Sequence, residues 1–258
     1  MPSYYRLGEV PAKRHVQFRS PEGNLLAEEV FGAEGFSGNY SILYHRALPA
    51  QARSQTPIGS AKPAAWESAA HRHYHLRTRR LEPRGNSVSG RVPLMFNDDV
   101  TISLAISSEP PAGFYKNGTH DELVFVHEGS GVLATQFGEL PFGPGDYLYI
   151  PRGTTQQLRL NGNVGRLLVV EANGPIDTPG RYRNEHGQLL EHAPYWERDF
   201  RKPESLPPHT ESEEGAFEIL LKIGDALHHY AVDHHPFDVV GWDGYLYPYA
   251  FNIGDFEP

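Results

Sequence analysis

Residues 113–156 contain a carboxylate and turn residues at a spacing that could build a metal site. Six residues separate Glu122 from Gly129, and fifteen more lead to a second glycine- and proline-marked segment at 145–153. First-row metal ions generally need three or more protein ligands at one site. Positions 115–118, however, read Tyr, Lys, Asn and Gly, so histidine is missing beside the carboxylate. The sequence therefore predicts the frame of a metal-binding β-barrel without its metal ligands.

This spacing resembles the two motifs of the cupin fold. In a cupin, histidines would stand three or four residues before Glu122 and again at position 156, which is Gln156 here. We interpret Glu122 and Gln156 as vestigial cupin positions, and we assign no catalytic and no metal-binding residue in this chain. Glu122 is expected to be satisfied by local donors such as Lys116 or Arg152 rather than by a cation.

Two histidine clusters are further candidates, because a chain with 14 histidines and no cysteine can bind a transition metal only through His and carboxylate. His71, His73 and His75 would share one face if they lie on a strand. Four nearby arginines would oppose a cation, so this segment is predicted to be solvated or to face an anion. They are Arg72, Arg77, Arg79 and Arg80.

The second cluster spans residues 228–235, where His228 and His229 precede His234 and His235. Adjacent residues on a strand point to opposite faces, so neither pair can chelate together. One member of each pair could face inward near a carboxylate, Asp233 or Asp238. The sequence favours local hydrogen bonding and leaves a metal site open as the alternative.

Composition excludes several classes of function. The formal charge of −9 argues against a nucleic-acid partner, which would require a basic face. No apolar run reaches the 18 residues of a membrane span, and residues 1–20 lack the apolar core of a secretory signal. With no cysteines, the chain is predicted to be cytoplasmic.

The fold is predicted to be all-β, a cupin jelly-roll with an irregular N-terminal arm. Short apolar runs bounded by Gly, Pro or Asn predict strands. These runs are residues 100–106, 123–127, 131–137, 147–150 and 166–170. Residues 213–225 fit a helix or a strand equally.

We divide the chain into an N-terminal arm with loops (residues 1–65), a degenerate cupin barrel (66–175) and a crossing segment with an aromatic extension (176–258). The arm is expected to pack across a neighbour or a sheet edge. Residues 51–63 are expected to be an exposed loop. The aromatic tail 237–256 is interpreted as a packing surface with apolar area left for a partner element.

Several stretches across the chain resemble the homogentisate 1,2-dioxygenase family, in particular its bacterial members. They include YYRLGE at residues 4–9, EGFSG at 34–38, FNDDV at 96–100, DELVFVHEGSG at 121–131, GDYLYIPRGTT at 145–155, YRNEHGQLLEH at 182–192 and HPFDVVGWDG at 235–244. The resemblance implies an enzyme of tyrosine and phenylalanine breakdown that uses non-haem Fe(II) and O2 to open homogentisate to maleylacetoacetate. It also implies a homo-oligomer, a trimer or a hexamer.

In that family two histidines and a glutamate of a second, C-terminal cupin hold the iron, and nothing in residues 1–258 matches them. The chain is therefore interpreted as the non-catalytic N-terminal portion, with no cofactor of its own. A shortened form of a longer protein, a split gene and a genuine short paralogue all stay open. The alternatives are a non-enzymatic scaffold with a vestigial pocket, and a metalloenzyme that uses one of the histidine clusters.

Overall fold

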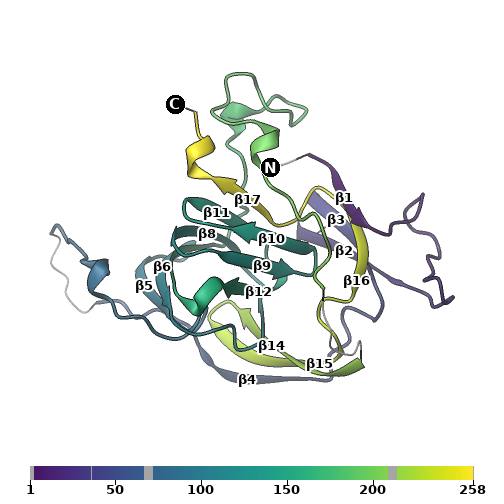
Figure 1. Ribbon diagram of the computed structural model, residues 1–258, viewed down its shortest axis with the longest axis horizontal. Coiled ribbons are helices and arrows are strands. Elements are labelled where there is room, and N and C mark those ends of the chain that lie inside the picture. Colours follow the sequence, from purple (N-terminus) through teal and green to yellow (C-terminus); the bar gives the residue numbers. More distant parts are fainter. Residues whose placement is uncertain (1–2, 36, 67–71, 209–213, 258) are drawn as a thin grey trace.

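The computed structural model describes residues 3–35, 37–66, 72–208 and 214–257, and it is all-β (Figure 1). The strands in this part of the chain form sheets of four, seven and six strands. The prediction of an all-β cupin fold is confirmed. Within the described ranges, no helix is long and apolar enough to cross a membrane.

The jelly-roll is built from two sheets that face each other. The six-stranded sheet has the order β17-β11-β8-β13-β6-β5, and the seven-stranded sheet has the order β10-β9-β12-β7-β14-β15-β4. Their bounds are β4 Ser54–Ser60, β5 Arg91–Phe96, β6 Val100–Ser107, β7 Phe114–Asn117, β8 Asp121–Glu128, β9 Gly131–Thr135, β10 Gly138–Phe142, β11 Asp146–Ile150, β12 Thr155–Leu160, β13 Gly165–Ala172, β14 Glu214–Ile223, β15 Ala226–His234 and β17 Tyr249–Asn252. Alternating apolar residues of these strands, such as Val124, Val126, Leu167 and Val169, form the barrel core.

A smaller sheet packs on the side of the barrel. Its order is β1-β16-β3-β2, with bounds β1 Tyr5–Gly8, β2 Ala27–Glu34, β3 Ser37–His45 and β16 Val239–Gly244. Trp242 is fully buried between this sheet and the barrel, and its indole N–H donates to the carbonyl of Phe137 at 2.7 Å. Tyr247 and Tyr249 belong to the same cluster. The aromatic tail is therefore largely an internal core of this chain.

Three expectations about local structure were wrong or are now decided. The first 65 residues are not loop-like, because they supply β1 to β4. Gly35, with a φ of +61°, lies in the β2–β3 turn, whereas Gly32 and Gly38 belong to the two strands themselves. Residues 51–63 contain the edge strand β4, although all its residues are exposed. Of residues 213–225, Glu214–Ile223 form β14, in which Ile219 and Leu221 alternate into the core, and residue 213 lies outside the described residues. The five strands predicted at residues 100–170 are confirmed as β6, β8, β9, β11 and β13.

The three predicted segments share sheets with one another. β14 pairs in parallel with β7, β15 pairs with β4, and β17 pairs with β11. Figure 1 shows the yellow C-terminal strands lying against the purple N-terminal sheet and the teal barrel. The predicted boundaries stay a prediction, and strands of each segment complete sheets that contain strands of another.

Candidate functional site

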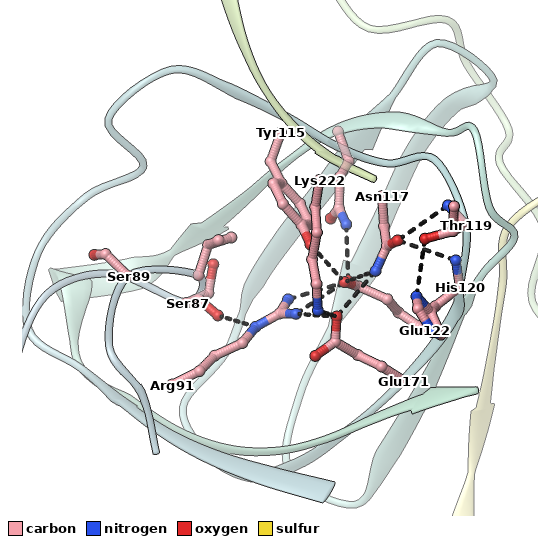
Figure 2. Close-up of polar contacts among 12 residues, drawn as sticks. Ser87, Ser89, Arg91, Tyr115, Asn117, Thr119, His120, Glu122, Glu171 and Lys222 are labelled. Carbon is pink, nitrogen blue, oxygen red and sulfur yellow. Dashed lines mark hydrogen bonds and ion pairs between the residues drawn. The ribbon is translucent and has the colours of Figure 1, made fainter. Parts of the chain in front are cut away.

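Glu122 lies at the inner end of the barrel, where six strands bring polar side chains together (Figure 2). In the register of β8 and β13, Glu122 lies directly opposite Glu171. Like charges in that position repel each other. The neighbouring strands supply the compensating groups, which are Arg91 from β5, Tyr115 and Asn117 from β7, Gln156 from β12 and Lys222 from β14.

Arg91 binds Glu122 through two parallel hydrogen bonds. Its Nη1 lies 2.8 Å from Oε1 and its Nη2 lies 3.1 Å from Oε2. The Arg91 Nε donates to the Ser87 carbonyl at 3.0 Å, which fixes the plane of the guanidinium. This bidentate geometry is the strong form of the arginine–carboxylate pair.

Three further donors complete the shell of the carboxylate. Oε1 accepts hydrogen bonds from the Tyr115 hydroxyl at 3.0 Å and from the Asn117 amide at 3.1 Å. Oε2 accepts one from the Gln156 amide at 3.3 Å. Glu122 is only 1% exposed, so these bonds and Arg91 replace all of its water.

Glu171 is held in the same network. Its Oε1 lies 2.6 Å from the Lys222 ammonium and accepts a hydrogen bond from Asn117 at 2.9 Å. Arg91 Nη1 is 3.4 Å away. Two carboxylates therefore face two cations, and the cluster is neutral.

The electrostatics follow from this arrangement. Burial alone would raise the pKa of Glu122, but the Arg91 charge and the hydrogen bonds from Arg91, Asn117 and Tyr115 lower it to about 2. Burial, reinforced by the Glu122 charge, raises the pKa of the Tyr115 hydroxyl well above its usual range. Glu122 is therefore ionised and Tyr115 is a neutral donor at physiological pH.

This donor set does not fit iron. A 2-His-1-carboxylate site needs neutral imidazoles and open positions. Here the guanidinium of Arg91 occupies both oxygens of the carboxylate, and Gln156 donates an N–H instead of a lone pair. In the ranges that the structure describes, no three His, Asp or Glu side chains lie together as a metal site.

Glu122 and Gln156, which the sequence interprets as vestigial cupin positions, are hydrogen-bonded to each other, but the predicted partners Lys116 and Arg152 do not bind Glu122. Arg152 binds the neighbouring carboxylate, Asp121, at 2.9 Å. The charge of Lys116 interacts instead with Glu29 and Asp238. Arg91 was missed because it lies 31 residues before Glu122 and belongs to no motif.

The histidine clusters do not assemble a site among the described residues. His71 lies outside them, and His73 and His75 are exposed in a segment without regular structure. His228 and His229 lie on β15, where His229 is 3.4 Å from Glu218 and His228 contacts Gln55. His235 is buried between the rings of Phe114, Phe217 and Phe237.

A second buried ionic group was not predicted at all. His45 on β3 lies 2.8 Å from Asp238 and 2.9 Å from Glu29. Burial opposes the charged ring, but the two carboxylates prevail and raise the pKa of His45 to about 9. The sequence suggested Asp238 as a partner for a neighbouring histidine, whereas its partner is 193 residues away.

A cavity of about 400 Å³ lies in front of the Arg91–Glu122 pair. Its walls include core side chains of the barrel such as Val124, Leu158 and Val169. Arg91, Tyr115 and Gln156 also line it. The position that a metal would occupy in a cupin is thus closed by an ion pair, while the space before it is open.

The fold is a cupin barrel, and an internal ion pair of Arg91 and Glu122 lies at its inner end. Residues 105–253 match the family described as "Homogentisate 1,2-dioxygenase N-terminal". The chain belongs to this family, which confirms the resemblance seen in the sequence.

Individual proteins are similar to this chain over different lengths. A protein of Saccharolobus solfataricus described as a "Putative dioxygenase" is 40% identical over 256 residues, which are 99% of this chain and 65% of that protein. The chain thus spans less than two thirds of this relative.

Among solved structures, a "Cupin 2 conserved barrel domain protein" from Leptotrichia buccalis is 13% identical with a TM-score of 0.32, over 76% of this chain and 98% of that one. A "putative mannose-6-phosphate isomerase" from Ralstonia eutropha is 22% identical with a TM-score of 0.33, over 40% and 100%.

Proposed function

We propose that residues 1–258 form the structural, non-catalytic portion of a homogentisate 1,2-dioxygenase-type enzyme. Such an enzyme uses Fe(II) and O2 to open the ring of homogentisate. Membership of the family and the 40% identity to a relative described as a dioxygenase support the class of reaction. That homogentisate is the substrate is likewise proposed.

The observation that carries the non-catalytic role is the closed pair of Arg91 and Glu122. Bound iron would supply open coordination positions for O2 and substrate. This barrel offers none, because both oxygens of the only carboxylate at the cupin position are bound by Arg91. Iron ligands would therefore come from residues outside 1–258.

The same reasoning weighs against a self-sufficient metalloenzyme. His73 and His75 are exposed, and among the described residues no three His, Asp or Glu side chains lie together as a metal site. On β15, His229 lies near Glu218 and His228 lies near Gln55. The cytoplasmic location and the absence of a nucleic-acid partner stay predictions.

We also propose a homo-oligomer, a trimer or a hexamer. Exposed large apolar side chains near the edge strand β5 support this, since such patches are typical of contact surfaces. They include Trp66, Tyr74, Leu76, Met95 and Phe96. Light scattering should give a mass of three or six chains; a stable monomer would contradict the proposal.

The proposed function is tested on the native protein, by intact mass, iron content and homogentisate turnover of the same sample. Iron and turnover are expected only where polypeptide beyond the 28.9 kDa of this chain co-purifies. Iron with turnover in a sample that contains the 28.9 kDa chain alone would overturn the proposal.

A further inference from the structure

The cavity in front of Arg91 is too large to be a packing defect. Protein interiors hold few voids larger than a water molecule, and an apolar cavity of roughly 150 Å³ already binds benzene. This one measures about 400 Å³ and is lined by apolar barrel residues, among them Leu158 and Val169. It has room for a small organic molecule.

The inner end of the cavity has unused hydrogen-bonding capacity of both kinds. A guanidinium has five N–H groups, and three of those of Arg91 donate to Ser87 and Glu122. Nη1 also lies 3.4 Å from Glu171, which leaves the second N–H of Nη2 as the spare donor. The Gln156 carbonyl oxygen accepts no hydrogen bond from the described residues, and the Tyr115 oxygen donates its hydrogen but keeps its lone pairs. Donor and acceptors at one place match a hydroxyl group, which both donates and accepts.

The open end of the cavity is acidic. Glu109 and Glu218 line it and are exposed. Arg91 is the only arginine or lysine in the described lining, and Glu122 already neutralises it. Glu218 lies 3.4 Å from the imidazole of His229, which also lines the cavity. An anion would still meet two exposed carboxylates on entry, whereas a neutral or cationic molecule would not be repelled by them.

We propose that this cavity binds a small, mainly apolar molecule that carries a hydroxyl group at its inner end and no negative charge. The hydroxyl contacts Arg91, Tyr115 and Gln156, and the other end lies between Glu109 and Glu218. Homogentisate carries a carboxylate, so the cavity is not a second site for the proposed substrate. This proposal can therefore fail or succeed independently of the proposed function.

Four probe molecules of similar size test separately the need for a hydroxyl group and the discrimination against negative charge. They are tyramine, 4-propylphenol, 3-(4-hydroxyphenyl)propionate and phenethylamine. Isothermal titration and ligand-detected NMR should show saturable binding of tyramine and 4-propylphenol. The anionic propionate and phenethylamine, which lacks the hydroxyl, should each bind on the order of tenfold more weakly than tyramine.

Variants locate the site. Ala112 is exposed at the cavity, so Ala112→Trp should abolish binding of all probes, while Ala52→Trp, an exposed alanine away from the lining, should not. Glu109→Gln combined with Glu218→Gln should remove the discrimination against the propionate, and Glu185→Gln should keep it. Unchanged circular dichroism would show that each variant is folded. Absence of saturable binding, equal binding of the anion to the wild type, or binding that survives Ala112→Trp would overturn the proposal.

Discussion

At the scale of single residues, a guanidinium takes the place of a metal ion. The sequence predicts that Glu122 is a vestigial cupin carboxylate, and in the structure Arg91 provides the positive charge beside it. A buried ion pair contributes little net stability compared with apolar residues, but removal of one partner leaves an uncompensated buried charge. Replacing Arg91 or Glu122 alone is therefore expected to destabilise the fold strongly.

Arg91→Met should lower the free energy of unfolding by about 3–5 kcal/mol, because Glu122 stays buried without its counter-ion. Arg91→Met combined with Glu122→Met should recover a large part of this loss. Urea denaturation of the wild type, both single variants and the double variant gives the coupling energy. If the double variant lost as much free energy of unfolding as the two single variants together, Arg91 and Glu122 would not be energetically coupled.

His45 makes stability depend on pH in the alkaline direction. Its pKa is raised from 6.5 to about 9, so its contribution is fully present below pH 6.5 and is lost as the pH rises through about 9. The free energy of unfolding should fall by up to about 3 kcal/mol across this range. His45→Gln should flatten the fall, whereas His186→Gln, which is exposed, should leave it as in the wild type. An equal fall in the His45 variant would contradict the assignment.

Spacing within the sequence identified Glu122 and Gln156 because both lie in a local motif. Arg91 and Lys222 could not be found in this way. They reach the carboxylates from strands that lie 31 and 51 residues away along the chain from their partners, and only the pairing of sheets brings them together. The His45–Asp238 pair was missed for the same reason.

At the scale of elements, local pattern predicted the barrel strands, whose apolar residues alternate and whose ends carry Gly or Pro. It failed for β1 to β4, where half or more of the residues are polar or exposed. β1 and β4 depend on partners distant in sequence, since β1 pairs with β16 and β4 pairs with β15. β2 and β3 pair with each other, and β3 also pairs with the distant β16. Local pattern contains no information on such pairing.

The junction of β1 and β16 gives a test at this scale. A Cβ added at Gly241 would overlap the backbone of Glu9, directly after β1. Gly241→Ala should therefore cost about 1–3 kcal/mol and increase hydrogen exchange in residues 5–8. Gly143→Ala, where nothing lies within 4 Å of the added atom, is the matched control. Similar stability of both variants would contradict the packing described here.

At the scale of the whole molecule, N- and C-terminal strands complete the sheets of the barrel. Residues 66–175 alone would lose β17 beside β11, β14 beside β7 and the sheet that covers Phe137. A polypeptide of residues 66–175 should therefore give poorly dispersed amide NMR signals, whereas the full chain gives a dispersed spectrum. A dispersed spectrum from residues 66–175 would show that the barrel folds by itself.

The central claim is that an internal ion pair fills the metal position of this barrel. Anaerobic titration of purified residues 1–258 with Fe(II), followed by desalting and metal analysis, tests it most directly. The wild type should retain far less than one ion per chain, as should Glu122→Gln. One tightly bound Fe(II) per chain in the wild type, lost in Glu122→Gln, would contradict the claim.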